Sequence, residues 1–167
     1  MPHIHDLIDF TIAAYIYHGD KVLLVKHKKY GGKWLAVGGH IELDEDSDQA
    51  LLREIEEESG LLARDISILS SKPASGVIGD PVKVKALYPP AFMDIHFTNV
   101  EGTHRHLNLI YFVQSRSNAV TLTDEHEALR WFGEEELEAA AFGLTPGVKY
   151  YASVGFARIK SLPESIT

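Results

Sequence analysis

Four glutamates fall within five positions of the segment REIEEESG, residues 53–60, near the end of a predicted helix. Carboxylates three and four residues apart on a helix repel one another, and the C-terminus of a helix already carries partial negative charge. Arg53 is the only basic residue between Lys33 and Arg64. A solvated acidic helix face is the ordinary explanation of such a run. The scarcity of nearby cations favours a functional one.

The flanking residues predict a helix from about Asp46 to Ser59. Asp46 and Gln49 have the spacing of a capping box, which satisfies free backbone N–H groups at the start of a helix. Gly60 suits the left-handed conformation that commonly ends a helix. The acidic run is therefore expected to lie on the last two turns of this helix.

At about 100° per residue, Glu54, Glu57 and Glu58 fall within roughly a third of the helix circumference, whereas Glu56 points elsewhere. Three neighbouring carboxylates can stay ionised together if they bind hard divalent cations such as Mg²⁺, which prefer oxygen ligands. Gly38-Gly39 precedes this helix by a short loop, and glycine permits a close approach of the backbone to a ligand. The carbonyl of Gly38 is therefore a further candidate metal ligand.

The rest of the chain mixes predicted strands and helices without a regular repeat, which favours an α+β sandwich. Strands are expected at 10–17, 22–25, 66–69, 94–97, 106–113 and 128–132, with a further one considered at 82–87, and helices at 134–141 and 148–159. A turn is expected at 99–102, and a single domain is expected to span residues 1–167.

Composition excludes several classes of function. The formal net charge of −8 argues against non-specific nucleic-acid binding, although an anionic substrate is compatible with a site that supplies its own cations. The absence of cysteine excludes disulfides and thiolate sites. No stretch has the length and apolar character of a membrane span, and no secretory leader opens the sequence. A cytoplasmic protein that binds neither membrane nor nucleic acid is expected.

Residues 39–61, GHIELDEDSDQALLREIEEESGL, resemble the signature of the Nudix hydrolases. The positions that match at the required spacing are Gly39, Glu45, Arg53, Glu54, Ile55, Glu57, Glu58, Gly60 and Leu61. Val37 and Asp44 depart from residues that are frequent in relatives, but neither is a required position. The resemblance implies a Nudix-type α/β/α sandwich with a mixed β-sheet.

The resemblance also implies a reaction, namely cleavage of a nucleoside diphosphate linked to another moiety by water, with Mg²⁺ or Mn²⁺ as cofactor. The main metal ligands would be Glu57 and Glu58, with Glu54 as a further ligand or as the base that takes a proton from water. Arg53 and Glu45 would pair and hold the helix against the preceding loop.

Many relatives take another carboxylate from a loop shortly before the final tryptophan segment. Glu125 is the candidate here, because of its position relative to Trp131, and Glu127 is the neighbouring alternative. The ordinary interpretation of Glu125, a loop glutamate in solvent, carries about equal weight.

Three histidines lie in the segment DIHFTNVEGTHRHLNLIYF, residues 94–112. If its two strands pair, His96, His104 and His106 converge, because alternate residues of a strand share one face. These side chains are candidates for contacting phosphate or sugar, or for binding a metal as neutral imidazoles. A half-exposed polar sheet face is the alternative. Lys33 could attract phosphate, with a solvated surface lysine as the alternative. Trp34, Tyr30 and Phe92 could stack on a base, although aromatic residues in such a sheet more often belong to the core.

Two other function classes compete with the hydrolase. Isopentenyl diphosphate isomerase resembles Nudix proteins but uses a cysteine, which this chain lacks. A non-catalytic nucleotide or metabolite sensor of the same fold is the remaining alternative, and the intact carboxylate set counts against it. The partner expected is a small-molecule nucleoside diphosphate derivative of open identity, and assembly as a homodimer is left open.

Overall fold

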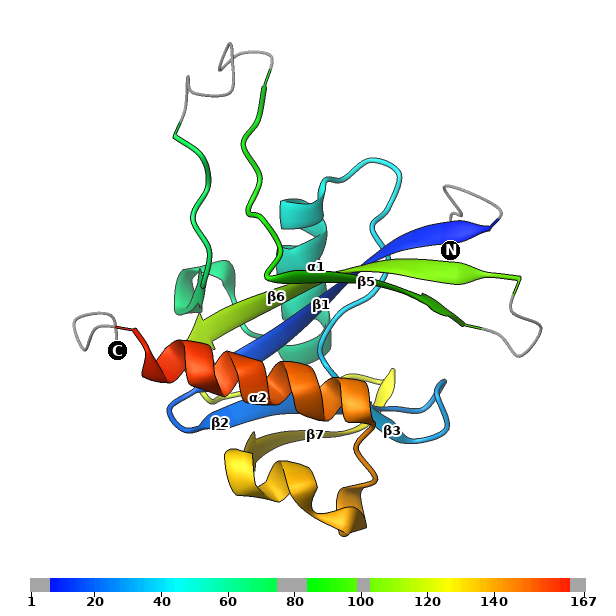
Figure 1. Ribbon diagram of the computed structural model, residues 1–167, viewed down its shortest axis with the longest axis vertical. Helices are drawn as coiled ribbons and strands as arrows, with labels where there is room; N and C mark the ends of the chain where they lie inside the picture. The colour runs from blue at the N-terminus through cyan, green and yellow to red at the C-terminus, as the bar shows by residue number, and fades with distance from the viewer. Residues whose placement is uncertain (1–6, 75–83, 99–102, 163–167) are drawn as a thin grey trace.

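The computed structural model describes residues 7–74, 84–98 and 103–162 (Figure 1). Its strands are β1 (Ile8–His18), β2 (Lys21–His27), β3 (Lys33–Leu35), β4 (Ile66–Ile68), β5 (Phe92–Phe97), β6 (Arg105–Ser115) and β7 (His126–Gly133). Its helices are α1 (Ser47–Ser59) and α2 (Pro146–Lys160), with short 3-10 helices at Ala63–Asp65, Glu134–Glu138 and Ala140–Phe142. The α+β class with a mixed sheet is confirmed.

The parallel pair of β1 and β6 lies at the centre of the sheet, and the other strands pair antiparallel with their neighbours. Strands β1 and β2 pair only between residues 16–18 and 21–23 and then diverge. Beyond that point β3 pairs with β2, while the chain that follows β3 runs beside β1. The two glycines that precede the α1 loop are thereby held inside the sheet.

Alternation along β1 sends its side chains into two separate cores. Ile12 and Ile16 belong to the core beneath α1, whereas Tyr15 and Tyr17 belong to the core beneath α2. Figure 1 shows α2 crossing one face of the sheet and α1 on the opposite face. Each face of the sheet is therefore available for a different site.

Two segments differ from the predicted secondary structure, and a third lies outside the described residues. No strand occurs at residues 84–87, because Lys85 pairs with Asp46 and the N–H of Tyr88 bonds to Asp48, which ties this segment to the start of α1. The helix expected at 134–141 is two 3-10 helices, because Ala139 takes an extended conformation between them. The turn expected at 99–102 lies outside the described residues.

The remaining expected elements, including both long helices, are confirmed within a few residues. Among the described residues, no helix combines the length and apolar character needed to cross a lipid bilayer.

Candidate active site

Helix α1 is bounded by the residues that its sequence indicates. The side chain of Asp46 accepts hydrogen bonds from the N–H groups of Asp48 and Gln49, and the side chain of Gln49 accepts one from the N–H of Asp46. Gly60 ends the helix in the left-handed conformation, with φ of 74°. The capping box and the glycine stop are confirmed, and they fix which residues fall on the last two turns.

A pocket lies over these last two turns. Glu54, Glu57 and Glu58 line it from α1, and Thr123 and Glu125 line it from the segment that precedes β7. The exposed Glu56 does not line it. The pocket therefore gathers four carboxylates, and their roles as metal ligands or base stay predictions.

Arg53 connects three carboxylates and the loop that precedes α1. Its guanidinium donates to both oxygens of Glu45, at 3.0 and 2.6 Å, and to the carbonyl of His40 at 3.0 Å. Its Nη1 also donates to Glu54 and Glu57, at 2.9 Å each. The expected Arg53–Glu45 pair is present in the structure, and the same cation bridges the pair to the pocket.

Glu54 occupies space that is available only because residue 39 is glycine. A Cβ atom at Gly39 would lie 2.3 Å from Oε1 of Glu54. The Glu54 side chain is almost fully buried, and this burial raises the pKa of its carboxyl above the usual value, against the lowering effect of Arg53. A buried carboxylate of raised pKa is suited to exchanging a proton near neutral pH.

Glu58 is the most enclosed of the pocket carboxylates. Its Oε2 accepts a hydrogen bond from the N–H of Gly38 at 2.8 Å, and its Oε1 lies 3.0 Å from Nε2 of His126. Burial raises the pKa of Glu58 to about 8, and the neighbouring charges of Glu54, Glu125 and Glu57 act in the same direction. The pocket thus holds more negative charge than its own cation neutralises.

Two histidines beside Glu58 were not predicted from the sequence as site residues. His27 and His126 are paired opposite each other on β2 and β7, and both are buried, with ring centroids 4.4 Å apart. Nε2 of His27 lies 3.9 Å from Oε1 of Glu58. Burial lowers the pKa of His27 to about 4, so its imidazole is neutral at pH 7. The only sequence signal was the alternation of His27 with Leu23 and Val25, which places it toward α1.

The hydrogen bonds around Gly38 indicate the direction of its carbonyl, the predicted metal ligand. The carbonyls of Val37 and Gly39 accept hydrogen bonds from Ala14 and Ile12 of β1. In an extended chain, the N–H and C=O of one residue point to the same side, opposite to those of its neighbours. Since the N–H of Gly38 points to Glu58, we expect its carbonyl to face the pocket.

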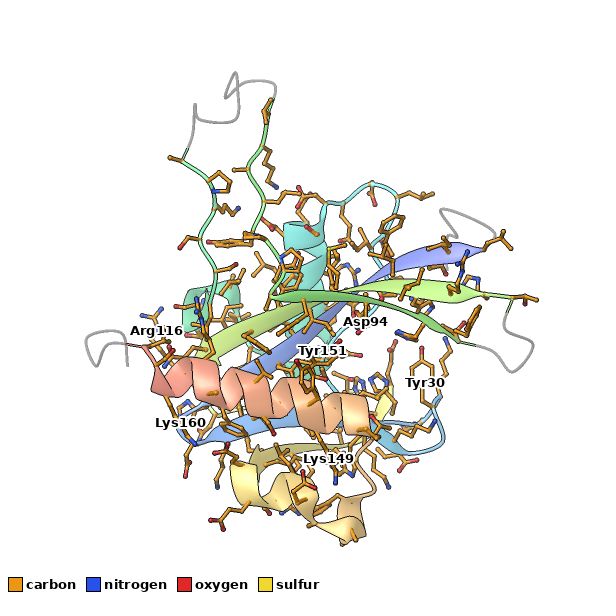
Figure 2. The ribbon with its side chains drawn as sticks, viewed as in Figure 1. Tyr30, Asp94, Arg116, Lys149, Tyr151 and Lys160 are labelled. Carbon is orange, nitrogen blue, oxygen red and sulfur yellow. The ribbon has the colours of Figure 1, made fainter. Side chains whose placement is uncertain are left out.

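The three histidines that were expected to contact the substrate lie outside the carboxylate pocket. His96 of β5 pairs opposite His106 of β6, as the alternation predicts, and Nε2 of His104 lies 3.1 Å from the carboxylate of Asp9. None of the three lines the carboxylate pocket. This patch is on the α2 face, where Tyr151 of α2 donates to Asp94 of β5 (Figure 2). Substrate binding by these histidines stays a prediction.

Two of the aromatic candidates, Trp34 and Tyr30, differ in burial and position. Trp34 lies in the core beneath α2 and packs edge-on against Phe132, so its position favours packing over the predicted contact with substrate. Tyr30 is 40% exposed and contacts His27, with ring centroids 5.4 Å apart, and Figure 2 shows it in the loop after β2. Lys33 is exposed at the start of β3. Tyr30 is the aromatic side chain best placed beside the carboxylate pocket.

The family model for the NUDIX domain matches residues 9–152 of the chain. No curated protein matches the sequence. Among solved structures, a hydrolase of the NUDIX family from Clostridium perfringens is 27% identical with a TM-score of 0.75, and the match covers 90% of this chain and 97% of that chain.

Two further solved structures share the fold at lower identity. The dihydroneopterin triphosphate pyrophosphohydrolase of E. coli is 18% identical with a TM-score of 0.63, covering 89% of this chain and 97% of that one. The NUDIX domain of NrtR from Shewanella oneidensis, solved in complex with ADP ribose, is 16% identical with a TM-score of 0.60, covering 95% and 91%. At these identities the similarity establishes the fold alone.

The substitution Gly39→Ala tests the packing of Glu54. The added methyl group would overlap Oε1 of Glu54, so the side chain must move, and we expect the free energy of unfolding to fall by about 1–3 kcal/mol. Gly147→Ala is the matched control, because a Cβ atom there meets nothing within 4 Å. Chemical denaturation of both variants measures the difference. Equal stability of the two would contradict the close approach of Glu54 to Gly39.

The raised pKa of Glu58 predicts a pH dependence of stability. With a pKa of about 8 in the folded chain, against an ordinary glutamate pKa of 4.5 in the unfolded chain, the folded state binds more protons, so this contribution to stability falls as pH rises toward 8. His27 acts in the opposite direction near pH 6.5, because burial lowers its folded pKa to about 4 and the unfolded chain still releases a proton there, and this opposition fades toward pH 8. Without divalent metal, the contribution of Glu58 to the free energy of unfolding should fall across this window by about 1.5 kcal/mol.

Thermal and urea unfolding from pH 6.5 to 8, in the presence of chelator, measure this dependence. Glu58→Gln should flatten it, whereas Glu56→Gln, on the exposed side of the same helix, should leave it unchanged. A wild-type pH dependence equal to that of Glu58→Gln would refute the assignment.

Proposed function

This chain belongs to the Nudix family and is a Nudix-type hydrolase, and from that premise we propose that it is a metal-dependent diphosphatase of nucleoside diphosphate derivatives. The reaction would be attack of water at phosphorus, with cleavage of the bond between two phosphate groups. The observation that carries the proposal is the pocket in which four carboxylates meet.

The donor set of this pocket fits a hard divalent cation. Its carboxylate oxygens are the ligands that Mg²⁺ and Mn²⁺ prefer, and the hydrogen bonds from Arg53 hold Glu54 and Glu57 side by side despite their mutual repulsion. We assign Glu57 and Glu58 as the main ligands, with Glu125 and the carbonyl of Gly38 as additional ones. When bound, Mg²⁺ or Mn²⁺ would neutralise phosphate charge and acidify a water molecule.

The protein groups around the ligands have separate tasks. The N–H of Gly38 and the imidazole of His126 hold the two oxygens of Glu58 in place. Arg53 holds Glu54 and Glu57 at fixed positions and is itself fixed by Glu45. Such positioning matters because misplacement of a ligand by a fraction of an ångström weakens both binding and catalysis.

Glu54 is the group that we assign as general base. Its raised pKa brings the carboxyl closer to the working pH, which improves proton transfer from water. Its Oε1 accepts the hydrogen bond from Nη1 of Arg53, so we assign Oε2 as the atom that takes the proton. A role for Glu54 as a further metal ligand is the alternative that the sequence left open.

The charge of the pocket and the similar solved structures both support a diphosphate-containing substrate. A diphosphate brings negative charge into a pocket of carboxylates, so it can bind only with cations, which the divalent metal would supply. The similar E. coli structure is named for its action on dihydroneopterin triphosphate. The similar structure from Shewanella oneidensis was solved in complex with ADP ribose. We therefore propose a nucleoside triphosphate, ADP-ribose, a sugar nucleotide or a dinucleotide, with Tyr30 available to stack on a base.

A panel of these compounds, assayed with Mg²⁺ or Mn²⁺, tests the proposal. We expect turnover of at least one member and a loss of at least about a hundredfold in kcat/KM for Glu57→Gln, because an uncharged amide is a much poorer metal ligand. The melting temperature without metal should change little, since the Glu57 side chain is 61% exposed.

Glu56→Gln is the matched control, because it removes the same charge from the next residue without touching the pocket. It should retain activity within about twofold. Equal activity of the Glu57→Gln and wild-type enzymes would overturn the metal-site assignment. Binding of a panel member without turnover under either metal would instead support the non-catalytic sensor.

A further inference from the structure

A second group of metal-ligating side chains lies on the α2 face of the sheet, away from the carboxylate pocket. It consists of Asp9, His104 and His106, with His40 beside them, and is called here the histidine cluster. Atoms of Asp9, His104 and His106 that could bind a metal all lie within 4.8 Å of one another. None of these residues lines the carboxylate pocket.

The fold brings the cluster together from three segments. Asp9 of β1 and His106 of β6 are partners in the parallel register at the centre of the sheet. His104 immediately precedes β6, and alternate residues of an extended chain share one face. His40 reaches the same place because its segment pairs with β1 at Thr11. The cluster therefore depends on the two central strands and is held by the most regular part of the sheet.

Two imidazoles converge on one oxygen of the buried carboxylate. Nε2 of His104 lies 3.1 Å and Nε2 of His40 lies 3.3 Å from Oδ2 of Asp9, whose side chain is only 3% exposed. Ligands of a tetrahedral zinc ion, at 2.0–2.1 Å from the metal, are separated from one another by about 3.3–3.4 Å. The observed separations are close to those that a single ion would impose.

The imidazole of His106 is held in the neutral form that binds a metal ion. Burial lowers the pKa of His106 to about 4, and the neighbouring His40 and His96 act in the same direction, against the attraction of Asp9. The His106 ring contacts those of His40 and His104, with centroid separations of 4.8 and 5.6 Å. A neutral imidazole offers a lone pair to a metal ion, and the ring contacts bring the other imidazoles of the cluster beside it.

We propose that Asp9, His104 and His106 form a binding site for a divalent transition-metal ion of the zinc type. Two imidazoles and one carboxylate make a donor set that suits zinc or cobalt better than magnesium, which prefers an all-oxygen shell. The His40 imidazole, beside the same carboxylate oxygen, is the nearest candidate for a fourth ligand. The site is distinct from the carboxylate pocket in position and in chemistry.

An ion at this site would link β1, β6 and the segment that carries Gly38 and Gly39. The carbonyl of His40 accepts a hydrogen bond from Arg53, so the cluster borders the residue that organises the carboxylate pocket. Binding to the folded state alone raises stability in proportion to the logarithm of the free metal concentration. Zinc-type ions should therefore raise the melting temperature even when the carboxylate pocket is disabled.

Cobalt binding to the full chain tests the site directly. The Glu58→Gln variant serves as the background, because it removes the carboxylate that His27 and His126 share and so disables the other His–Glu–His group. Titration with Co²⁺ in excess Mg²⁺, followed by visible absorption, should show one Co²⁺ per chain with the intense bands of low-coordinate cobalt. Adding His104→Ala or His106→Ala should weaken the affinity at least tenfold and abolish the rise in melting temperature.

His18→Ala in the same background is the matched control, because it removes one histidine that belongs to neither group, and it should bind Co²⁺ as tightly as the background. Melting curves in chelator establish that each variant is folded before titration; His104 is partly exposed, which makes His104→Ala the milder change. Three outcomes would overturn the proposal: no Co²⁺ bound, affinity unchanged by both cluster substitutions, or an equal loss in His18→Ala.

Discussion

The active-site end of this Nudix protein depends on one guanidinium group. Arg53 makes hydrogen bonds with Glu45, Glu54, Glu57 and the carbonyl of His40, so a single cation joins the loop before α1 to the carboxylates on α1. Arginine suits this task because its planar fork offers five donors in fixed directions, which the point charge of lysine does not. Without it, carboxylates on neighbouring turns would repel one another and the loop would lose its attachment. Arg53 thus neutralises only part of the acidic run, and the pocket keeps an excess of carboxylates.

The divergence of β1 and β2 explains how one sheet can carry two different sites. It admits the segment with Gly38 and Gly39 into the sheet, where Gly38 contacts Glu58 on the α1 face and His40 contacts Asp9 on the α2 face. The α1 face gathers carboxylates, which suit hard cations and phosphates, whereas the α2 face gathers imidazoles around a buried aspartate.

Local signals predicted α1 well, and non-local contacts account for most of what was missed. The capping box at Asp46 and the glycine stop act within a few residues, so the sequence contains all the information needed. The contact of His126 with Glu58 depends on the register of β7 against β2, about a hundred positions apart, and no local pattern encodes it. The alternation of His104 and His106 indicated a shared face but not that the face lies opposite the carboxylates, which required the parallel pairing of β1 with β6.

The central claim is that the carboxylates organised by Arg53 form a binding site for a divalent metal ion. A crystal structure of the protein grown with Mn²⁺, with anomalous diffraction measured to locate the ion, tests this claim most directly. An anomalous peak within bonding distance of the carboxylates of Glu57 and Glu58 is the predicted result, and it should disappear in crystals of Glu57→Gln. A wild-type crystal that contains Mn²⁺ only elsewhere, or none at all, would contradict the account.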